Sequence, residues 1–229
     1  MTTRKIEYWV IPPQADAEFV AGMEEVLDTY EKPYDPDYPV LCMDEQPQQL
    51  TKETRTPLPA TKKHPRRMDY EYERAGTANL FLFCEPLVGW RSVTVRPQKT
   101  KVDWAREVAA LLDTRYAQAK QVTLVCDNYK THTRGALYEA FPPDQARDYV
   151  KRLHFCHTPV HGSWLNIAEN ELSCITRQCL TAMRYGSIQA LRKAVGCWSD
   201  HKNENQRTVD WQFRTTDARG KLKSLYPRL

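Results

Sequence analysis

The chain has 229 residues, 41% of them hydrophobic and 27% charged, so it can bury one sizeable core and is not a disordered protein. Its net charge of +4 is only a weak sign of a polyanionic partner. No apolar run is long enough for a membrane span, and residues 1–13 lack the apolar run of a signal peptide. The seven cysteines form no CxxC pair, which favours a reducing cytoplasm over a disulfide framework.

Apolar spacing along the chain predicts alternating strands and helices. Residues 15–30 carry the apolar stripe of a helix, and Val40–Met43 is a short buried strand that ends at Asp44. Residues 51–75 are polar and are expected to be irregular, and Gly89 suits a turn between two strands. The other expected elements are strands at 80–84, 92–95, 122–126 and 150–155, and helices at 103–116, 134–141, 144–149, 164–180 and 188–201. This order predicts an α/β layered fold.

Two acidic residues follow apolar, strand-like runs. Asp44 ends the run VLCMD, and Asp127 ends the run VTLVCD. In α/β sheets, functional groups gather just beyond the ends of strands. One such aspartate is more often a turn former or a helix cap. Two aspartates that follow similar apolar runs favour a shared functional site, but this pattern alone does not establish one.

Glu169 is the third acidic candidate. It lies in the first turns of the helix expected from Trp164, where the helix N-terminus stabilises a carboxylate. Glu171 lies two residues on, about 200° around the helix, so both glutamates cannot face one site. Periodicity alone does not decide between them, and we expect Glu171 to be solvated.

A basic run lies among prolines between residues 57 and 67. It includes Lys62, Lys63, Arg66 and Arg67. Such a loop could follow DNA phosphates or could simply be solvated, and charge alone does not choose between the two.

Four residues between 154 and 161 have side chains that can bind zinc, namely His154, Cys156, His157 and His161. Their spacing matches no structural zinc pattern, and no second pair of ligands follows. The sequence therefore does not predict a zinc site.

Several longer segments point to a family. They include VLCMDEQPQQL, YERAGTANLF, LVCDNYKTHT, HGSWLNIAENELSCITRQCL and VDWQFRTTDARGKLKSLYP. Two elements are the most specific: Asp-Asn-x-x-x-His at Asp127, Asn128 and His132, and Ser-Trp-Leu-Asn-x-x-Glu, which ends at Glu169. From about residue 5 to residue 227, the chain resembles the bacterial insertion-sequence branch of the mariner superfamily of transposases.

The resemblance implies a ribonuclease-H-like mixed sheet flanked by helices, with Asp44, Asp127 and Glu169 as its acidic triad. The spacing of the last two is longer than in eukaryotic relatives, which we attribute to residues 142–149. The implied cofactor is two Mg²⁺ or Mn²⁺ ions, which align the attacking oxygen and stabilise the leaving one. Asp44 would bridge both ions, and Asp127 and Glu169 would each hold one. Water would attack in cleavage, and the freed 3′-hydroxyl would attack in joining.

Residues after Asp127 are candidate auxiliaries. Asn128 and His132 belong to the motif, and His132 either orients a phosphate or a water or makes only local hydrogen bonds. Lys130 is a candidate phosphate contact, together with the basic run.

The implied partner is DNA, both transposon ends and target, bound by a homodimer in the bacterial cytoplasm at the nucleoid. We expect a helical extension and connector at 1–38, the catalytic domain at 39–202 and a basic tail at 203–229. Relatives carry an N-terminal helix-turn-helix region, so a separate helix-turn-helix product or a truncated copy is expected here. The alternatives are an inactive remnant that only binds DNA, and a repair or recombination nuclease of the same fold.

Overall fold

Five strands form a single mixed sheet in the order β3-β2-β1-β4-β5. The structure is a computed structural model and describes residues 14–181 and 183–227, so the expectations for residues 1–13 lie outside it. Antiparallel pairing joins β3, β2 and β1, whereas β4 and β5 run parallel to β1. The strands are β1 (Val40–Glu53), β2 (Tyr72–Glu85), β3 (Trp90–Arg96), β4 (Val122–Asp127) and β5 (Leu153–Thr158).

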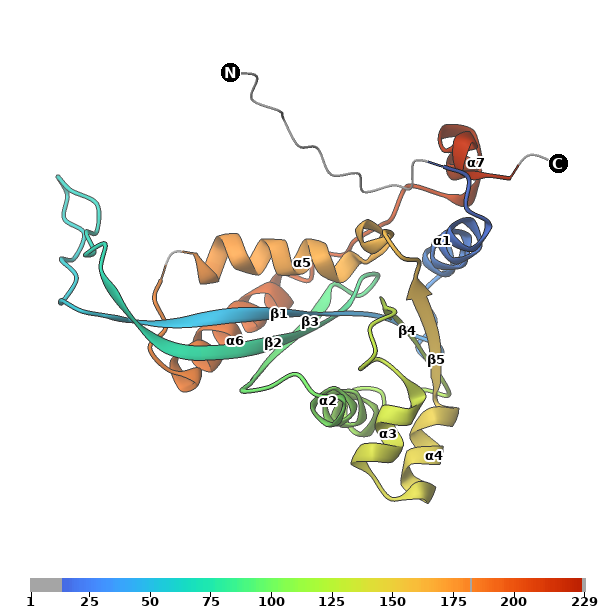
Figure 1. Ribbon diagram of the computed structural model, residues 1–229, viewed down its shortest axis with the longest axis horizontal. Coiled ribbons are helices and arrows are strands. Elements are labelled where there is room, and N and C mark those ends of the chain that lie inside the picture. The colour runs from blue at the N-terminus through green and yellow to red at the C-terminus, as the bar shows by residue number, and fades with distance from the viewer. Residues whose placement is uncertain (1–13, 182, 228–229) are drawn as a thin grey trace.

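Helices cover both faces of this sheet (Figure 1). One face carries α1 (Ala17–Tyr30), α5 (Ile167–Ile175) and α6 (Ile188–Asn205), and the other carries α2 (Lys101–Asp113), α3 (Arg134–Ala140) and α4 (Pro143–Lys151). The predicted α/β fold, a ribonuclease-H-like mixed sheet between helices, is confirmed. No helix among the described residues is long and apolar enough to cross a membrane.

The alternation of β1 assigns its residues to the two faces. Leu41 and Met43 are buried in the core on the α2 side, whereas Cys42 is buried in the core on the α1 and α5 side. Because successive side chains of a strand point to opposite faces, Asp44 follows Cys42 and Glu45 follows Met43. The side chains of Asp44 and Glu45 therefore lie on opposite faces of the sheet.

β1 does not end at Asp44, as the sequence suggested. Its parallel pairing with β4 covers only Val40 to Cys42, but its antiparallel pairing with β2 continues to Glu53. The polar residues beyond Asp44 lack the apolar pattern of a buried strand, yet backbone pairing with β2 keeps them extended. Asp44 therefore lies inside a long strand, just past the point where β4 stops pairing with it.

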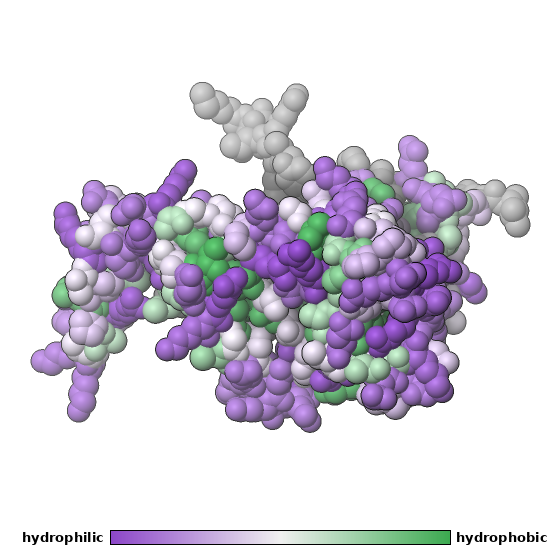
Figure 2. Space-filling view, turned by 90° about the horizontal axis from the view of Figure 1, so that it is seen from below, coloured by the Kyte–Doolittle hydropathy of each residue, from purple (hydrophilic) through white to green (hydrophobic). Residues whose placement is uncertain are grey.

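Residues 54–71 connect the two long strands, and we call them the arm. Leu58 pairs with Arg67 across it, and the Arg184 side chain ties its base by an ion pair to Glu53, with Nη1 and Oε2 2.7 Å apart. The arm projects from the sheet at the far end of the β1–β2 hairpin (Figure 1). Its side chains are mostly hydrophilic and protrude into solvent (Figure 2).

Several other expected boundaries were wrong. β2 begins at Tyr72 rather than at residue 80, so it includes residues that were expected to be irregular. β5 begins at Leu153 rather than at residue 150, because α4 continues to Lys151. The helix expected at 164–180 is divided into a 3-10 turn at Ser163–Leu165, then α5, then a π-helical turn at Thr176–Leu180. Asn166 has extended φ and ψ angles of −82° and 109°, so it interrupts the helix and caps α5.

The C-terminal segment folds back onto α1. The basic residue Arg219, in α7 (Thr215–Lys221), donates two hydrogen bonds of 2.8 Å to the carboxylate of Glu24. The main-chain N–H of Asp16 donates to the carbonyl of Leu225 over 3.0 Å. Arg219 is therefore neutralised within the protein.

Candidate active site

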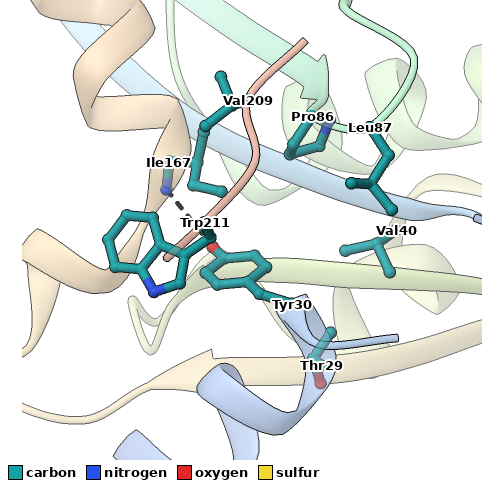
Figure 3. Close-up of a pocket in the computed structure, with 8 residues that line it drawn as sticks. All are labelled: Thr29, Tyr30, Val40, Pro86, Leu87, Ile167, Val209 and Trp211. Carbon is teal, nitrogen blue, oxygen red and sulfur yellow. Dashed lines mark hydrogen bonds between the residues drawn. The ribbon is translucent and has the colours of Figure 1, made fainter. Parts of the chain in front are cut away.

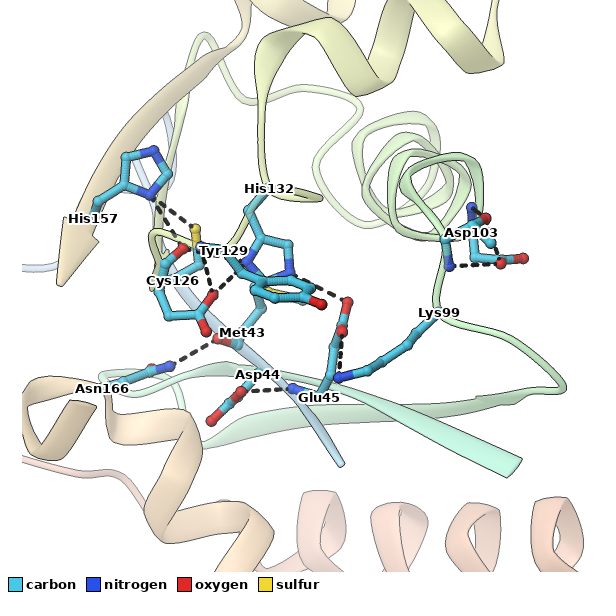
Figure 4. Close-up of polar contacts among 12 residues, drawn as sticks. Met43, Asp44, Glu45, Lys99, Asp103, Cys126, Tyr129, His132, His157 and Asn166 are labelled. Atoms are coloured by element: carbon cyan, nitrogen blue, oxygen red, sulfur yellow. Dashed lines mark hydrogen bonds and ion pairs between the residues drawn. The ribbon is translucent and has the colours of Figure 1, made fainter. Parts of the chain in front are cut away.

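Asp44 lies on the α5 side of β1, at the centre of the candidate site (Figure 4). Its Oδ1 accepts a hydrogen bond of 2.7 Å from the main-chain N–H of Glu45. Burial and the negative charges of Asp127 and Glu169 raise the pKa of Asp44 to about 7, against the lowering effect of that hydrogen bond. Asp44 is thus near enough to Asp127 and to Glu169 to be repelled by each of them.

Asp127 ends β4, which is the parallel neighbour of β1. Cys42 pairs with Val125, so Asp44 and Asp127 occupy equivalent positions two residues further along their strands. The Oδ1 atom of Asp127 lies 2.6 Å from His132 Nδ1 and 3.3 Å from the main-chain nitrogen of Tyr129. Burial raises the pKa of Asp127, but the hydrogen bond and charge of His132 outweigh it and lower that pKa. The carboxylate is therefore ionised and fixed at one oxygen.

Glu169 is in the first turn of α5, and Asn166 fastens that turn to β1. The Asn166 Nδ2 donates to the carbonyl of Met43 over 2.9 Å, while its Oδ1 accepts from the N–H of Ala168 over 3.1 Å. One buried side chain therefore caps the helix that carries Glu169 and bonds the residue before Asp44 (Figure 4). This contact sets the distance between the strand and the helix.

Tyr30, the last residue of α1, anchors the same turn from the other side. Its hydroxyl donates to the carbonyl of Leu165 over 2.9 Å and accepts from the N–H of Ile167 over 3.4 Å. The Tyr30 ring packs against Trp211 with their ring centroids 5.4 Å apart, in a small apolar hollow (Figure 3). This hollow is not the site, but its packing supports the start of α5.

Glu171 is not solvated, contrary to the expectation from its position on the helix. It is buried and bonded at both oxygens by Arg91, with distances of 2.7 and 2.8 Å. Arg91 also donates to the carbonyls of Gly89 and Arg207. The face of α5 opposite Glu169 covers the β2–β3 turn and the C-terminal segment, where buried Arg91 needs a counter-charge. Of the two glutamates, Glu169 is the one whose charge raises the Asp44 pKa.

His132 joins Asp127 to a residue that the sequence analysis missed, Glu45. Only 2% of His132 is exposed, and its Nε2 lies 3.2 Å from Glu45 Oε1. Burial lowers the pKa of His132, but hydrogen bonds to Asp127, Cys126 and Glu45 raise it to about 12, so both ring nitrogens donate. The contact is therefore not only local. The one available signal was the strand alternation, which places Glu45 on the face opposite Asp44.

The predicted DNA contacts fall into two separate places. Asn128 and Lys130 are exposed, and both lie in the loop that directly follows Asp127 at the end of β4. The exposed side chains of Lys62, Lys63, Arg66 and Arg67 lie on the arm. The structure does not bring this basic run to the carboxylates.

The carboxylates have the chemistry that a divalent cation requires. Carboxylate oxygens are the ligands that Mg²⁺ prefers, and a cation would relieve the repulsion that raises the pKa of Asp44. Within residues 14–181 and 183–227, however, no three His, Cys, Asp or Glu side chains already stand close enough to hold one ion together. To share a cation, these carboxylates would have to lie closer together than they do here.

Comparisons with known proteins show the family and the fold of the chain. The family model described as DDE superfamily endonuclease matches residues 39–192, more than half of the chain. No curated protein matches by sequence. Three similar structures are complexes of the mariner transposase Mos1.

A pre-cleavage Mos1 transpososome has a TM-score of 0.60 and 14% identity over 99% of this chain and 68% of that one. The Mos1 mariner paired end complex with Mn has a TM-score of 0.56 and 13% identity, covering 98% and 68%. The Mos1 strand transfer complex has a TM-score of 0.57 and 13% identity, covering 89% and 60%. At these identities the likeness establishes the fold, which is that of the Mos1 transposase. By its family match, the chain belongs to the DDE superfamily of endonucleases.

Proposed function

We propose that this chain is the catalytic part of a DNA transposase, which cuts transposon ends and joins their 3′-hydroxyls to target DNA. The observation that carries the proposal is geometric: Asp44 and Asp127 occupy equivalent positions on neighbouring parallel strands, and Asn166 ties the helix of Glu169 to the strand of Asp44. Burial and the nearby charges of Asp127 and Glu169 also raise the pKa of Asp44. Strongly perturbed carboxylates gathered at strand ends are typical of catalytic sites. The family match and the fold shared with the Mos1 complexes support the same function.

In this proposal Asp44, Asp127 and Glu169 hold two Mg²⁺ or Mn²⁺ ions. The ions supply charge stabilisation at the reacting phosphate and help to generate the nucleophile. The protein supplies the geometry: Asp127 is fixed at Oδ1 by His132, and Glu169 is fixed by the docking of α5 through Asn166. Asp44, on which the charges of both Asp127 and Glu169 act, would be the residue shared by the ions.

We also propose that DNA contacts are made mainly with phosphates, by Lys130 near the site and by the arm. Lysine and arginine on exposed loops bind phosphates without reading sequence. Sequence-specific recognition of ends would then come from a separate helix-turn-helix product. A homodimer on DNA, a location at the bacterial nucleoid and the boundaries 1–38, 39–202 and 203–229 belong to the same proposal.

The test is metal-dependent cleavage of DNA that carries the element's ends. We expect nicking with Mg²⁺ or Mn²⁺, little with Ca²⁺, and none in chelator, because the geometry at the phosphate is demanding. Asp44→Asn should abolish it while the protein stays folded. Full activity in chelator, or in Asp44→Asn, would exclude the proposed chemistry.

A remnant that binds DNA without cutting it is the second candidate. It is favoured by the absence, among the described residues, of three side chains already spaced to hold an ion. The same experiment separates the two, since a remnant would shift the DNA in a gel and leave it intact with every metal.

A further inference from the structure

Glu45 is a buried carboxylate next to Asp44 that faces away from it. Its side chain is only 4% exposed and lies between two basic groups (Figure 4). His132 Nε2 is 3.2 Å from Oε1, and Lys99 Nζ is 3.6 Å from Oε2. A carboxylate is buried only when such partners are present. One of these partners, His132, also contacts the carboxylate of Asp127 in the candidate site.

The carboxylate of Asp127 is held at one end only. His132 Nδ1 and the main-chain N–H of Tyr129 both approach Oδ1, at 2.6 and 3.3 Å. In the described part of the chain, no hydrogen bond reaches Oδ2. The ion pair with His132 at one oxygen restricts rotation of the whole group, and the same Nδ1 also lies 3.3 Å from the main-chain carbonyl oxygen of Asp127. Oδ2 is therefore the oxygen presented for a cation.

His132 can restrict Asp127 only if its own ring is fixed. Trp104 packs beside the ring, with centroids 5.6 Å apart, but packing does not select the direction of the N–H bonds. The second nitrogen needs an acceptor, and Glu45 provides it. The Glu45–His132–Asp127 chain thus connects β1 to the end of β4 across the sheet.

We propose that Glu45 is a positioning residue, which acts through His132 to hold Asp127 with its Oδ2 toward the cation. Lys99 fixes the other oxygen of Glu45. Glu45 does not bind the cation itself, because the strand alternation places it on the face opposite Asp44. The inference deepens the proposed function and rests on it. Outer partners of metal ligands typically contribute 10–100-fold in metal affinity or activity.

The test is a double-mutant cycle on the full chain, with the dissociation constant for Mn²⁺ as the readout. We expect Glu45→Ala and His132→Ala each to raise that constant about 10–100-fold. The double variant should be no weaker than His132→Ala alone, because Glu45 acts through the histidine. In cleavage assays Glu45→Ala should lower kcat and leave the KM for DNA nearly unchanged.

Two further variants make the outcome clear. Glu45→Gln keeps an oxygen that accepts from His132, so its Mn²⁺ affinity should lie between wild type and Glu45→Ala. Glu107, a similarly buried carboxylate that pairs with Arg96, is the matched control. Glu107→Ala should lower the melting temperature but leave Mn²⁺ binding unchanged.

The inference is overturned if Glu45→Ala and Glu45→Gln both fold and have the same dissociation constant for Mn²⁺ as the wild-type protein. It is also overturned if the wild-type protein does not bind Mn²⁺. Additive losses in the double variant also overturn it, since they would mean that Glu45 acts independently of His132. The Mn²⁺ affinities could follow the expected order although neither the wild-type protein nor any variant cuts DNA. In that case the proposed function is wrong, but Glu45 still positions Asp127 for the cation.

Discussion

Asn166 donates a hydrogen bond from Nδ2 to the main-chain carbonyl of Met43 over 2.9 Å, across 123 residues of sequence. The same side chain caps α5. Since Asp44 follows Met43 and Glu169 lies in the capped turn, this one buried amide links two of the three proposed metal ligands. Its removal should therefore affect geometry as well as stability.

Asn166→Ala should lower the free energy of unfolding and cleavage together. Loss of an N-cap costs about 1 kcal/mol, and leaving the Met43 carbonyl buried without a donor costs about 1–3 kcal/mol more. Cleavage measured well below the melting temperature should fall by at least tenfold. Ser187→Ala is the control, because the Ser187 side chain caps α6 through the N–H of Ala190 and makes no hydrogen bond to β1 among the described residues. It should lose a similar cap energy and keep its activity.

Replacing the two glutamates of α5 should have different effects on cleavage and on stability. Glu169→Gln should abolish cleavage and leave the melting temperature near that of wild type. Glu171→Gln should instead destabilise the fold by about 3–5 kcal/mol, because it leaves Arg91 buried without a counter-charge. Thermal unfolding and cleavage of the folded fraction measure both. A stable Glu171→Gln without activity would place Glu171 in the site and contradict the assignment.

Stability should depend on pH through Asp44 when metal is absent. Its pKa is raised from 3.8 to about 7 in the folded chain, so the folded state binds the proton more tightly than the unfolded state. The contribution is complete below about pH 4 and is lost as the pH rises through 7. Wild type should therefore lose on the order of a few kcal/mol relative to Asp44→Asn across this window.

Denaturant unfolding of both proteins between pH 4 and 8 measures this difference. Addition of Mn²⁺ should restore wild-type stability at the upper end, since a bound cation favours the ionised carboxylate. Parallel pH profiles of wild type and Asp44→Asn would show that Asp44 is not perturbed.

Neutralising the arm should weaken DNA binding similarly for all sequences. Alanine at Lys62, Lys63, Arg66 and Arg67 should reduce the slope of log affinity against log salt by up to about 0.9 per lost phosphate contact. Fluorescence anisotropy at several salt concentrations, with end-containing and random duplexes, measures both effects.

The control for charge is a pair of basic residues that already have acidic partners elsewhere, Lys120 with Asp37 and Lys151 with Asp148. Their replacement should leave the salt slope unchanged. Tight, salt-insensitive and sequence-selective binding by the arm variant would show that DNA is held by other means.

Local pattern in the sequence was sufficient for the order of strands and helices and for the positions of Asp44 and Asp127 after apolar runs. It was also sufficient for the motif that singles out Glu169. These features are encoded in neighbouring residues, because apolar spacing and capping act over one or two turns. The α/β architecture follows from their order.

Tertiary structure alone decided which partners the acids have. Glu171 meets Arg91 from 80 residues away, and Glu45 meets His132 from 87 residues away. The extension of β1 to Glu53 likewise depends on its pairing with β2. Helical phase says only that Glu169 and Glu171 face different ways. Whether such a face meets a buried arginine, another carboxylate or water depends on contacts between segments that are distant in the chain. Local periodicity cannot predict those contacts, because it reflects only neighbouring residues.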